Sequence, residues 1–558
     1  MGYILGIWDG HDAGAALVHD SSIVFAVNEE RYTRRKLEVC FPRKSIQAII
    51  SQCSEIQAVA LSTSDFVKTM TRFVPEMKES YYLTRRRLRQ PTAPSAKLLK
   101  YKVTEFGTNS VLAYLSKKRI KKELASLGLV NVPIYVIDHH ECHAQAAARL
   151  SGFNKTLVIT LDGLGDGLSG TVSTYRNSVL TRVASLPATD SIGIFFEHVT
   201  NILNMRELED EGKVMAMAAY AYPVKLSENA MLDFFEIKNL STRAKYNALQ
   251  MYRELKKIHW KTPSEQFAFM AQQCLEHWVL KLVGQARSRY NYDNICLAGG
   301  VFANIKLNRK IRTMKGIKQC FIFPHMGDGG LAVGAAVALN YRLNRVGEYN
   351  FKDVFLGNEY STEQIRSALK SHNLKYASLK DPARAAAELI AKNKIIIWFQ
   401  GKMEYGPRAL GHRSILAAAD SSRLKDRLNI YMKKRVWFQP FCPSILDEDA
   451  ARLLADFDGV PNPFMTMAYM INEDHRKDLE GVIGIDGSCR PQIVTRDNAI
   501  FYKLLTELKR LKGFGVVLNT SLNIHGSPIA CSPENAIDIF LRTKVDNMLI
   551  GDLLVGRV

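Results

Sequence analysis

One pattern occurs twice in the first 345 positions, and it limits what the chain can fold into. The first copy, YILGIWDGHDAGAALVHDSSIVFAVNEE, begins at Tyr3, and the second, TLVITLDGLGDGLSGTVSTYRNSVLTRVAS, begins at Thr156. Each is typical of an apolar strand ending in Asp-Gly, a glycine-containing turn, a second strand, a polar turn and a third strand. Asp9 and Asp162 occupy matching places. The repeat therefore predicts two similar halves, each with an acidic first turn.

This duplicated meander resembles the actin-like ATPase fold of sugar kinases and heat-shock ATPases, an α/β fold built from two RNase H-like halves. The resemblance implies that the two Asp-bearing turns face each other across a nucleotide cleft. If the repeat is considered alone, the alternative is that the two β-meanders resemble each other by chance.

The length of the chain predicts a second domain, because 558 residues are too many for one hydrophobic core. After the turn-rich stretch NRVGEYNFKDVFLGNEY the pattern restarts, so we place domains at 1–345 and 346–558. A basic helical insertion is expected at about 70–125, where TRRRLRQ and SKKRIKKEL contribute to the net charge of +20. We interpret these runs as solvated helix faces; attraction for anionic substrates is the alternative. Since no nucleic-acid-binding signature accompanies them, nucleic acid is an unlikely partner.

The cysteines and the apolar runs bear on the compartment. Nine scattered cysteines without a CxxC pair indicate a reducing, cytoplasmic environment. The start, MGYILGIWDG, is too short for a signal peptide, and no run of about 18 apolar residues predicts a membrane span. The oligomeric state is left open.

A cluster of histidines lies in YVIDHHECHAQAAARL, residues 135–150. The apolar start predicts a strand and the alanine-rich end a helix. If the helix begins near Asp138, His139 and His143 lie four residues apart on one face and can bind one metal ion. The alternative is a pair of partly exposed histidines with no ligand. His140 would flank the pair, either beside the ligands or in packing.

Two glycine-rich turns follow predicted strands in the second half of the repeat. In ICLAGGVFANIKL, Gly299 and Gly300 precede a helix, where free backbone N–H groups let a nucleotide approach. In PHMGDGGLAVG, Asp328 is expected at the carboxyl end of a strand, where open α/β sheets bind ligands. A helix cap is the alternative role for Asp328.

Basic residues recur in turn-rich loops of the second domain and predict an anion pocket, because guanidinium forks suit phosphate or carboxylate. For each of them alone, a surface salt bridge is the alternative. The candidates are Arg408, Lys433, Arg435 and Arg490, with Asn519, Thr520 and Ser521 as neutral hydrogen-bonding groups.

Ten ordered stretches then make the resemblance specific, among them GHDAGAAL, NEERYTRRK, DHHECHAQAAA, LDGLGDG, LAGGVFAN, MGDGG and GKMEYGPRALGHRSIL. The chain resembles the O-carbamoyltransferase family of nodulation and antibiotic-tailoring enzymes. The resemblance implies an actin-like carbamoyl-transfer domain followed by a YrdC-like domain. It also implies ATP, with Mg²⁺, and carbamoyl phosphate as substrates, carbamoyl adenylate as intermediate, and a small hydroxylated metabolite as acceptor.

The resemblance also implies roles for individual residues. Fe(II), or another divalent metal, is expected on His139, His143, Asp162 and Asp328. His11 is expected to act as the general base, oriented by Asp12. Glu211, Lys213, Gly299, Gly300 and Asn304 are expected to contact the nucleotide. Carbamoyl phosphate is expected to meet Arg408, Lys433, Arg435, Arg490, Asn519, Thr520 and Ser521.

Four positions depart from the family pattern, all in the second domain. Val436 replaces a glutamate, Gln439 an arginine, His412 an asparagine and Ser527 a glutamate. Losing the arginine removes a charge-assisted hydrogen bond worth about 1.5–3 kcal/mol. A related ATP-dependent acyl- or amide-forming transferase with a different donor is therefore one alternative. A tRNA-modifying enzyme of the threonylcarbamoyl type is another.

Overall fold

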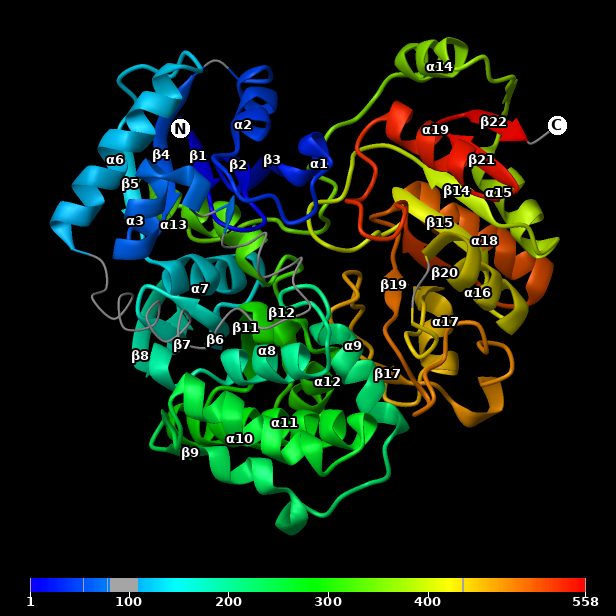
Figure 1. Cartoon of the computed structure of the whole chain (residues 1–558). Helices are drawn as coiled ribbons and strands as arrows, with labels where there is room; N and C mark the ends of the chain where they lie inside the picture. The colour runs from blue at the N-terminus through cyan, green and yellow to red at the C-terminus, as the bar shows by residue number, and fades with distance from the viewer. Residues whose placement is uncertain (1, 54, 78, 81–108, 434–435, 557–558) are drawn as a thin grey trace. The chain divides into compact units, whose positions relative to one another are not determined.

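The computed structural model describes residues 2–53, 55–77, 79–80, 109–433 and 436–556 (Figure 1). The chain forms two compact units: Met1–Glu29 with Leu37–Phe351, and Glu30–Lys36 with Lys352–Val558. The sequence pattern assigned Glu30–Lys36 to the first domain, whereas its contacts belong to the second unit. Of the predicted basic insertion, 81–108 lies outside the described residues, and α3 (Phe66–Phe73) packs on α6 (Ser110–Ala125).

The first unit holds two five-stranded sheets with the same topology, which confirms the predicted actin-like α/β fold. In each sheet the first three strands are antiparallel, and two later strands add in parallel beside the first. One sheet has the order β3-β2-β1-β4-β5, with β1 Tyr3–Trp8, β2 Gly14–His19, β3 Ser22–Asn28, β4 Ile56–Ser62 and β5 Ile134–Ile137. The other has the order β12-β11-β6-β7-β8, with β6 Lys155–Gly165, β7 Leu168–Arg176, β8 Val179–Pro187, β11 Asn294–Ala298 and β12 Gln319–Ile322.

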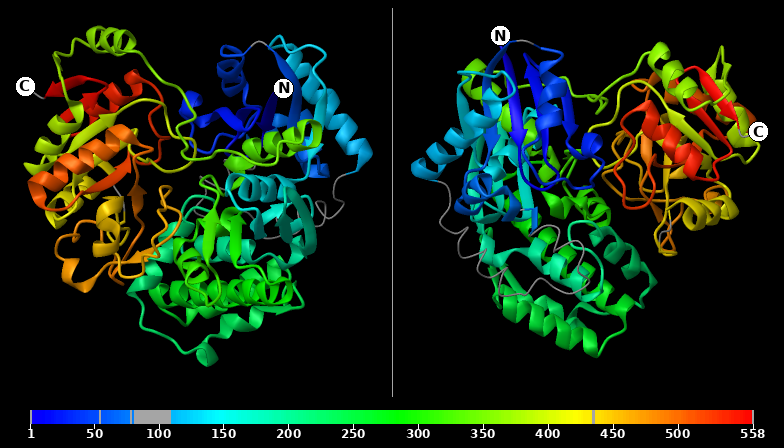
Figure 2. Two further views of the ribbon diagram at one scale, coloured as in Figure 1. Left: turned by 180° about the vertical axis from the view of Figure 1, so that it is seen from behind. Right: turned by 45° about the horizontal axis from the view of Figure 1, so that its top comes forward.

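Two small-residue helices fill the space between these sheets (Figures 1 and 2). Helix α13 (Leu331–Asn344) packs on β1, β2 and β4, α7 (His139–Leu150) packs on β6 and β11, and the two helices pack on each other. Their approach is close, since a Cβ added to Gly334 would lie 2.1 Å from the carbonyl oxygen of Cys142. The absence of a side chain at Gly334 thus allows the two helices to approach closely.

The remaining helices of the first unit lie mainly beside the second sheet. Helix α8 (Ile192–Ile202) packs on β6 and on α10 (Ala248–Trp260). The long α11 (Ser264–Tyr290) packs on α9 (Glu211–Met217) and α12 (Ile305–Arg312). The other elements are α2 (Arg43–Ile50) and the hairpin of β9 (Phe235–Lys238) and β10 (Ser241–Ala244).

The second unit contains an eight-stranded mixed sheet in the order β13-β22-β21-β14-β15-β20-β16-β19. Its strands are β13 Ala377–Ser378, β14 Ile396–Phe399, β15 Arg413–Ala418, β16 Cys442–Leu446, β19 Gln492–Val494, β20 Val516–Ser521, β21 Asn547–Ile550 and β22 Leu553–Gly556. Its helices are α1 Glu30–Thr33, α14 Thr362–Ser371, α15 Pro382–Ala391, α16 Ser422–Leu428, α17 Asp447–Leu453, α18 Ala499–Lys512 and α19 Pro533–Arg542. A two-stranded ribbon joins β17 (Tyr469–Met470) to β18 (Ser488–Cys489). The likeness of this unit to YrdC remains a prediction.

Within the described ranges, no helix combines the length and the apolar character that crossing a membrane would require.

The contact between α7 and α13 gives a prediction about stability. Gly334→Ala should lower the free energy of unfolding by about 1–3 kcal/mol, the usual cost of overpacking, because the new methyl group meets backbone that cannot move aside. Gly284→Ala in α11 is the matched control, since its Cβ would meet nothing nearer than Met314 Cε at 3.8 Å. The control should be neutral or stabilising by up to about 1 kcal/mol. Thermal unfolding of both variants checks this, and equal midpoints would contradict the close contact.

Candidate metal centre and anion site

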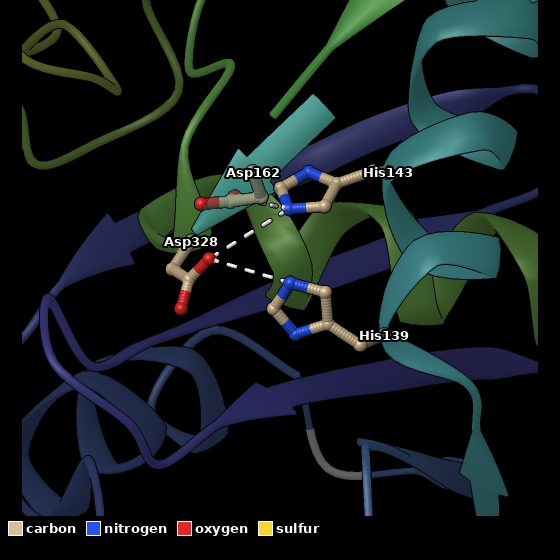
Figure 3. A group of neighbouring side chains, drawn as sticks. All are labelled: His139, His143, Asp162 and Asp328. Atoms are coloured by element: carbon tan, nitrogen blue, oxygen red, sulfur yellow. Dashed lines mark ion pairs between the residues drawn. The ribbon is translucent and has the colours of Figure 1, made fainter. Parts of the chain in front are cut away.

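Four side chains from three elements meet in the first unit (Figure 3). His139 and His143 come from α7, Asp162 from β6, and Asp328 from the turn after β12. One ligand atom from each lies within 4.8 Å of the other three. His143 Nε2 is 3.2 Å from Asp162 Oδ2, and His139 Nε2 is 3.5 Å from Asp328 Oδ1. The structure thus brings together the four residues that the sequence assigned to a metal.

Local structure explains how three of the four side chains are held. Asp138 caps α7 by accepting a hydrogen bond from the Glu141 N–H, so His139 starts the helix and His143 follows one turn later. Asp162 accepts hydrogen bonds from the N–H groups of Gly163 and Gly300, at 2.6 and 3.1 Å. These bonds fix the carboxylate so that it faces His143.

The electrostatics of the cluster indicate a site for positive charge. Burial raises the pKa of Asp328 to about 6, with repulsion from Asp162 as the second cause. Burial opposes protonation of His143, yet Asp162 and Asp328 outweigh it and raise the His143 pKa to about 9. Burial lowers the pKa of His139, and His143 lowers it further. Two carboxylates thus share one imidazolium.

The donor set fits a divalent transition metal. The Nε2 atoms of His139 and His143 are buried and form no hydrogen bond of good geometry, and mixed imidazole and carboxylate ligation suits Fe(II) and similar ions. His140 differs, because its Nδ1 lies 3.0 Å from Thr160 Oγ1 and its Nε2 lies 3.1 Å from the Leu168 carbonyl oxygen. Both ring nitrogens of His140 are used in packing α7 onto the second sheet.

His11 lies beside this cluster, with Nδ1 3.5 Å from Asp328 Oδ2. The carboxylate of Asp12, which was expected to orient His11, lies 3.6 Å from Nε2 of His325. Asp12 has a left-handed backbone (φ 59°), and its carbonyl accepts a hydrogen bond from Asn28. The Asp328 carboxylate therefore lies next to His11, and the Asp12 carboxylate lies next to His325.

The predicted nucleotide residues fall into two groups. Gly299 adopts φ 100°, and an added Cβ would lie 2.1 Å from the Leu161 carbonyl oxygen, so only glycine lets this loop reach β6. Asn304 caps α12 and exchanges hydrogen bonds with Gln272. Glu211 and Lys213 lie together on α9, where Lys213 pairs with Asp210 and burial raises the Glu211 pKa to about 8.

In the second unit, Lys433 holds the loop after β20. Its buried ammonium donates to Asn523 Oδ1 at 2.7 Å, to the Asn523 carbonyl at 3.0 Å and to the carbonyl of Ser521. Lys433, which the sequence predicted as an anion ligand, thus orders the backbone at Ser521 and Asn523.

Strand register brings the other predicted anion ligands to one end of the sheet. Asn519 is the register partner of Cys442, whose sulfur accepts hydrogen bonds from Arg490 at 3.0 and 3.2 Å. Asn519 Nδ2 also reaches the carbonyl of Ala409, at 3.2 Å, next to Arg408. Thr520 pairs with Ile415 in the same sheet. Arg435 lies outside the described residues.

Sequence reasoning missed an ion-pair cluster in the first unit. Asp9 is buried and bonded to Arg72 at 2.7 and 3.0 Å and to Lys68 at 3.1 Å. The Lys68 ammonium also lies 3.7 Å from the Trp8 ring centroid. Both cations come from α3, so the signal was two basic residues four positions apart in a helix that carries no acidic residue.

A second missed feature is the loop from Glu404 to Arg413. Oε1 of Glu404 accepts three backbone hydrogen bonds, from Leu410, His412 and Arg413, at 2.8–3.0 Å. His412, which departs from the family pattern, is accommodated by stacking on Phe355 at 3.6 Å and by a hydrogen-bond contact with the Lys402 carbonyl. The loop that carries Arg408 is therefore built around one buried carboxylate.

Comparison with known proteins gives matches along both units. A family model described as "Carbamoyltransferase N-terminus" matches residues 3–337, and one described as "Carbamoyltransferase C-terminus" matches 387–557. An uncharacterized protein of Methanocaldococcus jannaschii, MJ1051, is 32% identical over the full length of both chains. Nodulation protein NolNO of Sinorhizobium fredii is 30% identical over 98% of this chain and 79% of its own. Nodulation protein NolO of Bradyrhizobium diazoefficiens is 33% identical over 75% of this chain and 79% of its own.

The cluster predicts which substitution weakens metal binding. His143→Ala should weaken binding of Mn²⁺ or Fe²⁺ at least about 100-fold, because one of four ligands is lost. Cys142→Ala is the matched control, since this neighbour on α7 is equally buried but is not part of the four-residue cluster. Calorimetric titration measures both. Equal affinities in the two variants would show that the histidine is not a ligand.

Metal binding should also release a proton. The His143 pKa of about 9 means that this imidazole is protonated at pH 7.5 and must lose its proton to coordinate. Affinity should therefore rise about tenfold per pH unit between about pH 7 and 9 and level off above that range. Titration calorimetry in two buffers of different ionisation enthalpy measures the proton count. A pH-independent affinity with no proton released would contradict the shared imidazolium.

Proposed function

The chain belongs to the carbamoyltransferase family and is a carbamoyltransferase, and we propose that it uses ATP to activate carbamoyl phosphate as carbamoyl adenylate and transfers the carbamoyl group to a hydroxyl of a small metabolite. The observation that carries the proposal is the cluster of His139, His143, Asp162 and Asp328, built at the paired strand ends of an actin-like unit. The glycine turn expected to contact the nucleotide lies next to these ligands, since the Gly300 N–H donates to Asp162.

The proposed chemistry has three balanced steps. Carbamoyl phosphate and water give carbamate and inorganic phosphate. Carbamate oxygen then attacks the α-phosphorus of ATP, which forms carbamoyl adenylate and releases pyrophosphate. Finally the acceptor hydroxyl attacks the carbamoyl carbon, AMP leaves with the bonding electron pair, and the hydroxyl proton passes to a base. Because carbamate and its adenylate decompose in water, the steps require enclosure.

We assign the donor half of this reaction to the second unit. Arg408 and Arg490 would supply guanidinium forks for the phosphate of the donor, and the backbone around Ser521 would supply neutral hydrogen bonds. Lys433 would act by holding that backbone, since its ammonium already donates to Ser521 and Asn523. The half-buried Gln439, where the family has arginine, would contribute a neutral amide instead of charge.

We assign transfer to the first unit. His11 would accept the proton of the acceptor hydroxyl, a role suited to an imidazole whose ordinary pKa is about 6.5. Asp328, 3.5 Å away, would favour the imidazolium that results. A divalent ion held by the four ligands would supply positive charge for the phosphate of the adenylate and for the leaving AMP.

The two half-reactions give opposite expectations for two variants. With ATP, Mg²⁺ and labelled carbamoyl phosphate but no acceptor, the protein should form carbamoyl adenylate and pyrophosphate. Arg408→Ala should lower this at least about tenfold, the usual effect of losing a charged hydrogen bond. His11→Ala should leave the intermediate forming but block its use by hydroxylated acceptors. Chromatography of the labelled products distinguishes these outcomes.

A parallel reaction with acetyl phosphate tests the donor. Pyrophosphate release with the acetyl compound and none with the carbamoyl compound would overturn the assigned donor and favour an acyltransferase. Absence of any adenylate, with intact thermal unfolding, would overturn the proposed route through ATP.

A further inference from the structure

The segment Glu30–Lys36 leaves β3 of the first unit and joins the second unit. It begins with the single helical turn α1, and the buried Arg31 and the half-buried Arg34 point from it into loops of the second unit. The exposed Arg35 lies between Arg34 and Lys36. The segment therefore offers two guanidinium groups to the second unit from a distant part of the sequence.

Arg34 binds the loop that follows β20. Its Nη1 donates to the Ile529 carbonyl at 2.7 Å and its Nη2 to the Pro528 carbonyl at 2.8 Å. The same loop is closed on itself, because Asn523 Nδ2 donates to the Ser527 carbonyl at 2.6 Å. At the other end of the loop, the Lys433 ammonium donates a hydrogen bond to Asn523. Two cations thus fix the backbone that continues from Ser521.

Arg31 binds the other loop, from Glu404 to Arg413. Its Nη2 donates to the Gly406 carbonyl at 2.6 Å, two residues before Arg408, and its Nη1 lies 3.2 Å from Glu30 Oε1. Gly406 adopts φ 117°, a conformation reserved for glycine, so its carbonyl direction is set by this unusual backbone.

A lysine would be a poor replacement for either of the arginines that bind these carbonyls. A guanidinium presents donors in a rigid fork, so Arg34 reaches two successive carbonyls at once. Burying a charge is unfavourable, and placing a like charge nearby adds to the cost. Both effects act on Arg34, because burial lowers its pKa and repulsion from Arg31 lowers it further. The hydrogen bonds of the two guanidinium groups to three carbonyls oppose these costs.

We propose that Arg31 and Arg34 are positioning residues for the donor half-reaction, because they fix the loop that carries Arg408 and the loop that follows Ser521. Neither needs to touch the donor. The inference rests on the proposed function for the identity of that donor, but the arrangement of the loops can be measured without it.

The test compares Arg31→Ala and Arg34→Ala with Arg35→Ala, a matched loss of one exposed arginine from the same segment. Amide hydrogen exchange of the full chain should rise at least about tenfold in 404–413 for Arg31→Ala and in 522–530 for Arg34→Ala, and stay unchanged for Arg35→Ala. KM for carbamoyl phosphate in pyrophosphate release should rise about tenfold or more, with KM for ATP unchanged. Arg34→Lys should recover less than half of the loss, since it lacks the fork.

Each outcome decides the inference. Unchanged exchange in both loops, or equal effects in the Arg35→Ala control, would overturn it even if the enzyme forms carbamoyl adenylate. If the wild type releases no pyrophosphate with carbamoyl phosphate, the donor assignment fails while the exchange data still decide whether the arginines hold the loops. If an alanine variant unfolds, Arg31→Lys and Arg34→Lys provide the same two readouts.

Discussion

Carboxylate charge at matching positions near the carboxyl ends of two equivalent strands is the constraint on which the first unit depends. In the first copy of the repeat, Asp9 is neutralised by Arg72 and Lys68. In the second copy, Asp162 faces His143 and is joined by Asp328, so the negative charge exceeds what one imidazolium provides. The duplicated fold thus supplies two acidic turns. Fixed cations neutralise the first, and the second keeps an excess of negative charge beside two histidines.

The sequence identified the four side chains that cluster in the first unit, and their role as metal ligands stays a prediction. The assignment of Asp162 and Asp328 to the same metal came from the family resemblance. The spacing of His139 and His143 on one helix face and the position of Asp328 after a strand came from local patterns. The same reasoning identified the duplicated sheets, whose strand order confirms the repeat. It could not find Arg72 as the partner of Asp9, because that pair spans 63 positions and depends on how α3 docks.

For the second unit, the sequence predicted an anion site but not the contacts of the individual basic residues, for a physical reason. Basic residues in loops indicate an anion site, but they do not reveal which of them serve the anion and which hold backbone. Lys433 donates to the loop after β20, and Arg413 is fully buried with its guanidinium on backbone carbonyls. Whether a cation meets a ligand or a carbonyl is decided by tertiary packing, and residue type alone does not encode it.

Because Glu30–Lys36 belongs to the second unit, its position early in the sequence has a consequence for synthesis and folding of the chain. Arg31 leaves the ribosome 375 positions ahead of Gly406, and Arg34 leaves 495 positions ahead of Ile529, so the second unit completes its fold around a peptide synthesised long before it. A gene fragment encoding only the carboxy-terminal half would lack that peptide. A carboxy-terminal half taken from a relative would have to place three backbone carbonyls where Arg31 and Arg34 reach them.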